Sequence, residues 1–195
     1  MSISVNDIRE LREKTGAGMM DCKNALQECN GDIEKSIICL RKKGLAGIKD
    51  RSAKTASEGI VGHYIHAGGK IGVIVEINCE TDFVAKGEAF QQFAKDVAMH
   101  IAASNPLWIT RDEVPQDIIE REKEIFVDSL GGKPQQIIEK IIKGKMNRFF
   151  KETCLMEQLF VKDTNFTITD LFGDLASKVS EKMVVKRFTR YVVGE

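Results

Sequence analysis

An acidic residue and an aromatic residue stand side by side directly after a segment of alternating hydrophobicity. The alternating segment spans residues 71–78 and has the two-residue period of a β-strand, and the sequence Thr-Asp-Phe-Val-Ala follows at residues 81–85. A long helical pattern begins soon afterwards, so the motif is predicted to lie at the end of a strand and to be held rigidly between that strand and a helix. A carboxylate (Asp82) and an aromatic ring (Phe83) held in this way suit insertion into a partner.

The same residues also have ordinary structural interpretations. Asp82 is of a type that often caps the N-terminus of a helix, and Phe83 is of a type that is often buried in a core. Two methionines, Met19 and Met20, follow Gly18 in a predicted turn between two helices. Flexible apolar side chains at such a turn suit an adaptable contact surface. One or both also fit as plugs for a small helical bundle.

Covalent catalysis and metal binding find little support in the sequence. Gly69 and Lys70 lack the upstream glycine and the following hydroxyl residue of a phosphate-binding loop. His63 and His66 are predicted on opposite faces of a strand, and His100 lies within an apolar helical pattern, so these side chains do not converge on a metal. The acid of the 81–85 motif has no candidate base or nucleophile beside it. We therefore expect neither an enzyme nor a bound cofactor or metal.

The charge of the chain is balanced, with 29 lysines and arginines against 29 aspartates and glutamates among 195 residues. This balance disfavours nucleic acid and anionic membranes as direct partners. No apolar run approaches the ~18 residues of a membrane-spanning helix, and the start of the chain does not resemble a signal or transit peptide. The five cysteines are scattered and never spaced Cys-x-x-Cys, which favours reduced thiols in core positions of a cytoplasmic protein. The alternative location is the interior of an organelle that encodes the protein.

Three short helices are predicted within residues 1–46. Ser4 and Asp7 form an N-cap pattern at the start of the first helix. The dipeptide Asn30-Gly31 ends the second helix, and the third closes at residues 42–44. Apolar residues recur in each helix at intervals of three and four, so the three helices are expected to pack as a compact bundle.

A linker and a larger domain are predicted after the bundle. Residues 47–57 are polar, small and basic, which is typical of a linker. Residues 58–195 then form an α+β core, beginning with a hairpin of two strands over residues 59–65 and 71–78. The later elements are predicted as a helix over 90–101, a helical hairpin over 115–126 and 137–142, a strand over 154–161, a helix over 170–182 and a strand over 183–193. The expected fold class is α+β, with a small antiparallel sheet packed by helices.

Two long motifs resemble signatures of the translation elongation factor Ts family. The first is Leu-Arg-Glu-Lys-Thr-Gly-Ala-Gly-Met-Met-Asp-Cys-Lys-Asn-Ala-Leu at residues 11–26, and the second is Glu-Ile-Asn-Cys-Glu-Thr-Asp-Phe-Val-Ala-Lys at residues 76–86. Residues 157–163 and 185–191 also look like the family, so the resemblance covers essentially the whole chain. The chain resembles the short form, which has one core copy and lacks the second core subdomain and coiled-coil insertion of longer relatives.

The resemblance implies a ubiquitin-associated-like bundle followed by a dimerisation-type core, and with it a function. Proteins of this family bind the GDP form of the GTPase elongation factor Tu and speed GDP release, so that GTP can bind. The family's insertion motif, which disturbs the Mg²⁺ and phosphate site of the GTPase, corresponds here to Thr81, Asp82, Phe83 and Val84. Arg12, Met19 and Met20 match the family's N-terminal contact region. Short members pair through the core, so a homodimer is also expected.

Two other functions compete with nucleotide exchange. An adaptor would use the bundle to bind peptides or proteins without affecting a nucleotide, but this function does not explain the motif at residues 81–85. An RNA-binding protein would use two groups of basic residues and would show a steep salt dependence. These groups are Lys42, Lys43, Lys49, Arg51 and Lys54, and Lys143, Lys145 and Arg148.

Overall fold

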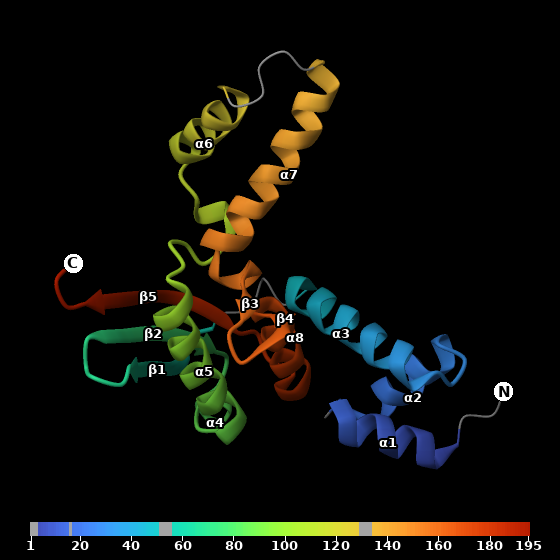
Figure 1. Cartoon of the computed structure of the whole chain (residues 1–195). Coiled ribbons are helices and arrows are strands. Elements are labelled where there is room, and N and C mark those ends of the chain that lie inside the picture. Colours follow the sequence, from blue (N-terminus) through green and yellow to red (C-terminus); the bar gives the residue numbers. More distant parts are fainter. Residues whose placement is uncertain (1–3, 16, 51–55, 129–133) are drawn as a thin grey trace.

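The computed structural model describes residues 4–15, 17–50, 56–128 and 134–195, and Figure 1 shows how its elements are arranged. The chain begins with α1 (Val5–Thr15), α2 (Met19–Glu28) and α3 (Ile33–Asp50). The later elements are β1 (Glu58–Ile65), β2 (Ile71–Cys79), α4 (Asp82–Ala85), α5 (Glu88–Ser104), η2 (Arg111–Glu113), α6 (Gln116–Asp128), α7 (Gln135–Thr153), η3 (Leu155–Glu157), β3 (Leu159–Phe160), β4 (Asp163–Thr167), α8 (Ile168–Val179) and β5 (Val184–Val192). Helices combine with small antiparallel sheets, which confirms the predicted α+β class.

The three N-terminal helices share a small apolar core of their own. Its buried residues are Leu11, Ala17, Cys22, Ala25, Leu26 and Leu40. The predicted cap of α1 is present, because the Asp7 amide donates to Ser4 Oγ and the Ser4 amide donates to the Asp7 carboxylate, each at 3.1 Å. Asn30 and Gly31 have left-handed backbones with φ of 54° and 83°, and they end α2 as predicted.

Helix α3 is longer than the sequence predicted. It continues to Asp50, whereas a helix end was predicted at residues 42–44 and a linker from residue 47. The two glycines inside this stretch each cost a helix about 1 kcal/mol relative to alanine, which weakens the helix without breaking it. Residues 51–55 of the predicted linker lie outside the described residues. The division of the chain into two domains remains a prediction.

The main sheet has three antiparallel strands in the order β1-β2-β5. Strands β1 and β2 form the predicted hairpin. Its turn contains Gly68 and Gly69 at φ of 89° and 68°, a backbone conformation that glycine adopts without a steric cost. Strand β5 pairs with the other edge of β2 and places Val184 opposite Asn78, near the end of β2. The residues after β2 and the residues before β5 therefore leave the sheet side by side.

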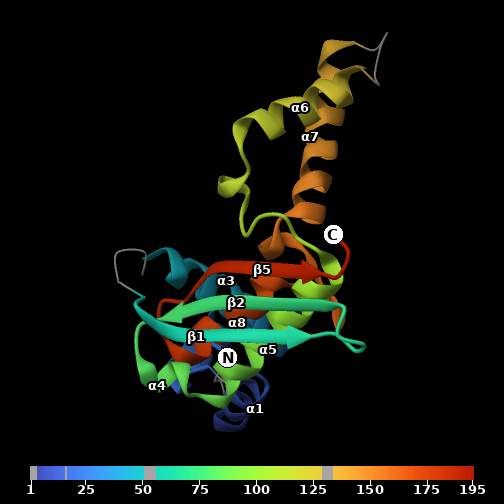
Figure 2. The ribbon, with the colours of Figure 1, turned by 90° about the vertical axis from the view of Figure 1, so that its left-hand side faces the viewer.

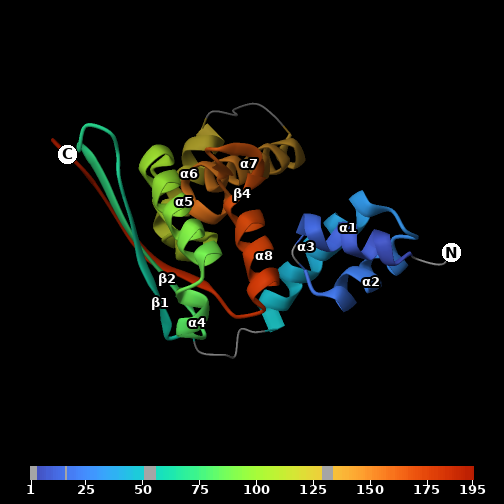
Figure 3. The ribbon, with the colours of Figure 1, turned by 90° about the horizontal axis from the view of Figure 1, so that it is seen from below.

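Helices cover one face of this sheet (Figure 3). Alternate residues of β2 point towards the helices and are fully buried: Val73, Val75, Ile77 and Cys79. Helix α5 lies against β1 and β2, and α8 packs against α5. The helices contribute Phe90, Phe93, Val97 and Ile101 from α5 and Ile168, Phe172, Leu175 and Ala176 from α8. This single core fixes the end of β2 from which the 81–85 motif departs.

Helices α6 and α7 project from the core as the predicted helical hairpin (Figures 1 and 2). At its base, the Arg111 guanidinium pairs with the Glu157 carboxylate and lies 4.7 Å from the centre of the Phe150 ring. The strand predicted over residues 154–161 is largely wrong, since a short 3-10 helix precedes a strand of only two residues. Cys154 and Leu155 are adjacent in sequence and both buried, which is incompatible with the alternation of a strand.

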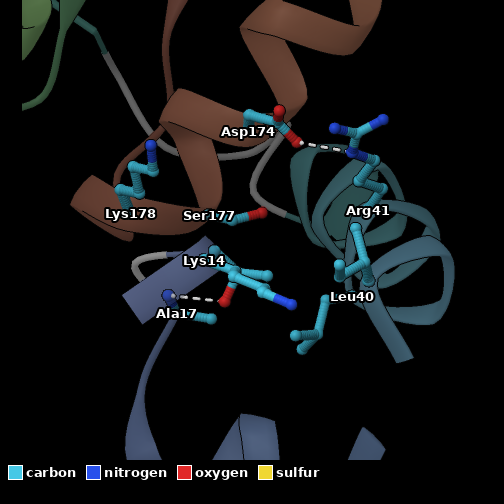
Figure 4. Close-up of a pocket in the computed structure, with 9 residues that line it drawn as sticks. Lys14, Ala17, Leu40, Arg41, Asp174, Ser177 and Lys178 are labelled. Carbon is cyan, nitrogen blue, oxygen red and sulfur yellow. Dashed lines mark hydrogen bonds and ion pairs between the residues drawn. The ribbon is translucent and has the colours of Figure 1, made fainter. Parts of the chain in front are cut away.

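Helix α3 packs beside α8 and joins the bundle to the core. Arg41 Nε lies 3.3 Å from Asp174 Oδ1, and the same guanidinium lies 4.6 Å from the centre of the Phe166 ring. Figure 4 shows Arg41 and Asp174 in direct contact at the edge of a small cavity of about 50 Å³ that both residues line. Burial raises the pKa of Asp174, and the nearby Arg41 acts in the opposite direction. These contacts hold the bundle against the end of the core that contains α8.

Candidate functional site

The 81–85 motif forms a one-turn helix directly beyond the end of β2. Thr81 has an extended backbone and caps α4, since its hydroxyl accepts the Val84 amide N–H at 3.4 Å. Ala85 is buried and fixes the inner side of the turn. The predicted position of the motif at a strand exit is therefore confirmed. The cap is Thr81 and not Asp82, which occupies the first helical position.

Phe83 is the large apolar side chain of the motif that is exposed to water. Its exposed fraction is 84%, so the interpretation of Phe83 as a core aromatic is wrong. Val84 packs partly against the core, and Thr81 and Asp82 are exposed. A large apolar ring held in water on a short, anchored helix has a cost for the free protein that contact with a partner would remove.

Asp82 is an ionised side chain with a neighbour of opposite charge. Lys86 Nζ lies 2.7 Å from Asp82 Oδ2, one helical turn away. The hydrogen bond from Lys86 lowers the pKa of Asp82, and the same bond raises the pKa of Lys86. Both side chains are exposed, so water screens the pair. Asp82 thus presents a carboxylate at neutral pH, and a partner can compete for it.

The carboxylate of Glu181 holds the turn from the other side. Glu181 Oε2 accepts the amide N–H groups of Glu80 and Thr81, each at 3.1 Å, and Oε1 accepts the Thr81 hydroxyl at 2.6 Å. In return, Glu80 Oε1 accepts the Lys182 amide at 2.6 Å. Sequence reasoning missed Glu181. In the sequence, Glu181 is marked by its position just before the final strand. That position becomes informative once β5 is known to pair with β2.

The N-terminal contact residues predicted from the family lie on α1 and α2. Arg12 is exposed on α1. Met19 and Met20 are 52% and 63% exposed, so neither plugs the bundle, whose core is filled by other residues. The prediction that they lie in a turn is wrong, because α2 already begins at Met19, with Gly18 as its extended N-cap. The first turn of α2 therefore presents both side chains from a regular helix.

The two sets of predicted site residues occupy separate parts of the molecule. Figures 1 and 3 both show α1 and α2 away from α4, with α3 and α8 between them. The structure brings Thr81, Asp82, Phe83 and Val84 together on one turn, and Met19 and Met20 together on another. A partner that touched both sets would have to span the face of the molecule between them.

The described ranges contain no group of three or more histidine, cysteine, aspartate or glutamate residues suited to a metal ion. In the same ranges, no helix has both the length and the apolar character needed to cross a bilayer. All five cysteines are free thiols, and three of them, Cys22, Cys79 and Cys154, are buried. Burial raises the pKa of each of these three thiols. These three fill core positions as predicted, whereas Cys29 and Cys39, for which the same was predicted, are only half-buried.

Comparison with known proteins gives a consistent result. The family model described as "Elongation factor TS" matches residues 47–195. The chain is 55% identical to an elongation factor Ts of Geobacter sulfurreducens, an alignment that covers 100% of the chain and 91% of that relative. It is 52% identical to an elongation factor Ts of Fervidobacterium nodosum, with 100% of both chains covered. It is 51% identical to one of Caldanaerobacter subterraneus, covering 99% of the chain and 98% of that relative.

Proposed function

The chain belongs to the elongation factor Ts family, and we propose that it is the guanine-nucleotide exchange factor of elongation factor Tu. It binds the GDP form of the GTPase, disturbs the Mg²⁺ and phosphate site, and promotes GDP release so that GTP can bind during translation elongation. The observation that carries this proposal is the exposed Phe83 ring on the anchored turn of α4. Burial of that ring in the GTPase gives a physical role to an otherwise unfavourable exposure.

The proposed exchange needs no covalent step in this protein. Asp82 and Phe83 enter the GTPase beside its Mg²⁺ site and shift groups that hold the ion and the β-phosphate. An exchange factor that lowers GDP affinity tenfold is itself bound tenfold less well when GDP is present, which is about 1.4 kcal/mol of coupling per decade. Acceleration therefore passes through a ternary intermediate of GTPase, GDP and this protein.

The N-terminal bundle supplies the second contact in this proposal. Met19 and Met20 present flexible apolar side chains on one helical turn, and Arg12 adds a cation on the neighbouring helix. Such a surface suits binding of the GTPase, because thioether side chains adapt to the shape of a partner. The bundle grips the GTPase while α4 acts on the nucleotide site.

A second copy of the chain is the other proposed partner, bound through the core. The face of the main sheet opposite α5 carries exposed apolar side chains, namely Val61, Ile65, Ile74 and Tyr191. Antiparallel sheets often leave one face in water, but that face is then usually polar. These four apolar side chains share the face with the Glu76–Arg187 ion pair, and their exposure favours pairing of two sheets.

The competing functions receive less support from the described residues. RNA binding would use Lys145 and Arg148, but Lys145 lies 5.0 Å from the centre of the Phe126 ring and Arg148 Nε lies 2.7 Å from Glu152 Oε1. Arg51 and Lys54, predicted for the other basic group, lie outside the described residues. An adaptor acting through the bundle alone leaves Phe83 without a role. We therefore propose no direct nucleic-acid or membrane partner.

Stopped-flow release of fluorescent GDP from purified elongation factor Tu tests the proposal. The release rate is measured across a concentration series of this protein, and it should rise steeply and saturate. Binding without acceleration would favour the adaptor function. The absence of both binding and acceleration would reject the proposed function.

A further inference from the structure

The turn between β2 and α4 receives its support from a residue about one hundred positions away. Strand β5 pairs antiparallel with β2 and sets Val184 opposite Asn78. Continuing this register beyond the last pair brings Lys182 beside Glu80 and Glu181 beside Thr81. The hydrogen bonds between these residues follow this geometry, but they are made by side chains where the strand ladder has ended.

The chain before β5 is shaped to deliver Glu181 to this place. Ser180 ends α8 with a left-handed backbone at φ 56°, which reverses the chain directly before Glu181. Met183 follows and is buried in the core at 2% exposure, so the segment is fixed on its other side too. Glu181 is therefore held between a helix end and a buried anchor.

The contacts of Glu181 reach the capping hydroxyl itself. Backbone N–H groups beyond the end of a strand ladder need other acceptors, and Glu181 Oε2 supplies one for both Glu80 and Thr81. The Thr81 hydroxyl donates to Glu181 Oε1 and accepts the Val84 amide. Because the donated proton points to Glu181, a lone pair of the same oxygen is directed to α4. Glu181 thus orients the cap of the helix that carries Phe83.

We propose that Glu181 is a positioning residue for nucleotide exchange, which holds the turn so that Asp82 and Phe83 enter the GTPase already oriented. This inference rests on the proposed exchange function and adds to it a residue outside the 81–85 motif. Because the turn is already ordered in the free protein, less binding free energy is lost to ordering it in the complex. Charged hydrogen-bond acceptors are the stronger ones, which suits a carboxylate to this role.

The expected effect falls on the exchange step more than on docking. Without Glu181 the protein still docks through the bundle, but a smaller fraction of complexes has Phe83 in place. In Glu181→Ala, the maximal rate of GDP release at saturation should fall about fivefold to tenfold, with the half-saturating concentration changed less than twofold. Glu181→Gln keeps an acceptor for both amides but places an NH2 donor opposite the Thr81 hydroxyl, so its maximal rate should lie between those of Glu181→Ala and the wild-type protein.

The experiment compares these variants in the stopped-flow assay of fluorescent GDP release from elongation factor Tu. Thr81→Val, which keeps the shape of threonine but loses its hydroxyl, should lower the maximal rate in the same direction. Glu157→Ala is the matched control, because that carboxylate also joins distant segments, through Arg111, but lies at the base of the α6–α7 hairpin. The control should keep the wild-type maximal rate.

A double-mutant cycle separates positioning from a general structural role. If Glu181 acts through Asp82 and Phe83, then Glu181→Ala should cause no further slowing in the Asp82→Ala, Phe83→Ala background. A full additional loss in that background, or a wild-type maximal rate in folded Glu181→Ala, would overturn the inference. A rise confined to the half-saturating concentration would overturn it as well.

Amide hydrogen exchange of the free protein tests the anchoring without the GTPase. The amides of Glu80, Thr81 and Val84 should exchange faster in Glu181→Ala than in the wild-type protein. In Glu157→Ala, the same three amides should exchange at the wild-type rate. Unchanged protection would reject the anchoring even if exchange activity fell. A wild-type protein that fails to accelerate GDP release rejects the proposed function, and the positioning role with it, whereas a normal wild type with normal Glu181 variants rejects the positioning role alone.

Discussion

At the scale of single residues, Phe83 and Asp82 are predicted to affect exchange and not folding. Phe83 is 84% exposed and Asp82 pairs with an exposed lysine, so the double variant Asp82→Ala, Phe83→Ala removes little that stabilises the free protein. The saturated rate of GDP release should fall at least about tenfold, equivalent to about 1.4 kcal/mol. Stopped-flow kinetics and circular dichroism on the same sample measure the two effects.

The matched control for this variant is Ile125→Ala. Ile125 is an exposed apolar side chain on α6, with 54% of its surface in water. Its removal also lowers exposed apolar area, but far from α4, so the rate of GDP release should not change. Wild-type kinetics in a correctly folded double variant would remove Asp82 and Phe83 from the mechanism.

His100 is predicted to make stability depend on pH. It is fully buried on α5, and its Nε2 lies 2.9 Å from Gln158 Oε1. Burial lowers the pKa of His100, and the hydrogen bond to Gln158 only partly opposes this effect. The unfolded chain therefore binds a proton more readily, so stability is complete above the unfolded pKa of about 6.5 and falls below it by at most about 1.4 kcal/mol per pH unit.

The test of this pH dependence is urea unfolding at pH 7.5 and pH 5.5. His100→Gln does not titrate and can still donate to Gln158, so its loss of stability on acidification should be smaller than that of the wild-type protein by roughly 1 kcal/mol. All other titrating groups are common to both proteins, so the difference isolates His100. Equal losses in the two proteins would show that His100 does not control the effect.

The sequence predicted the motif at residues 81–85, but it did not predict that Glu181 anchors this motif. An acid and an aromatic after an alternating run are visible as neighbours in the chain, and their place at the exit of β2 followed from the two-residue period. Glu181 is one of many glutamates in the sequence. Its role depends on the pairing of β2 with β5, and no local pattern encodes that long-range register.

At the scale of elements, the first turn of α2 is predicted to control affinity. Met19 and Met20 expose more than half of their surfaces, and the core of the bundle is complete without them. The double variant Met19→Ala, Met20→Ala should raise the half-saturating concentration about tenfold and leave the maximal rate of GDP release unchanged. The concentration series of the stopped-flow assay separates these two quantities.

Ile38→Ala is a suitable control for the methionine variant. Ile38 is 53% exposed and lies in the same bundle, on α3. It should leave both the half-saturating concentration and the maximal rate unchanged. An unaltered half-saturating concentration in the methionine variant would exclude this turn from the contact with the GTPase.

Errors in the predicted elements occurred where packing outweighs local pattern. Helix α3 passes two glycines and runs to Asp50, although glycine is a frequent helix terminator. In the segment at 154–161, Gln158 is buried and donates to the Glu152 carbonyl oxygen at 2.6 Å, so this polar side chain bonds back to the end of α7. Tertiary partners decide such cases, and they are distant in sequence.

At the scale of the whole molecule, the face of the main sheet that no helix covers is the feature on which the proposed pairing of two chains depends. The fold class was predictable from periodicity, but which face of the sheet stays uncovered depends on where α5 and α8 pack. Figure 3 shows both helices on the same side. On the other side, the outward residues of all three strands include several exposed apolar side chains.

This outer face is predicted to pair with a second copy of the chain. Ile74 lies on the central strand, opposite His63 and Thr189, and is 49% exposed. The wild-type protein should sediment at twice its chain mass of 21.8 kDa, and Ile74→Lys should sediment at the mass of one chain. A lysine at this point adds a charge to the centre of the face, and burying it without a partner is costly. Its long side chain stays solvated in the monomer, so the fold of each chain should persist.

Ile125→Lys provides the comparison, since it places the same charge on an equally exposed apolar position of α6. That variant should keep the mass of the wild-type protein. Sedimentation equilibrium over a range of micromolar concentrations distinguishes the three proteins. A wild-type protein that is monomeric throughout, or an Ile74→Lys variant that stays dimeric, would show that this face does not join two chains. Ile74 lies within β2, on the face opposite α5, whereas Phe83 lies beyond the end of β2, so the monomeric variant should still accelerate GDP release, with each chain carrying a complete exchange site.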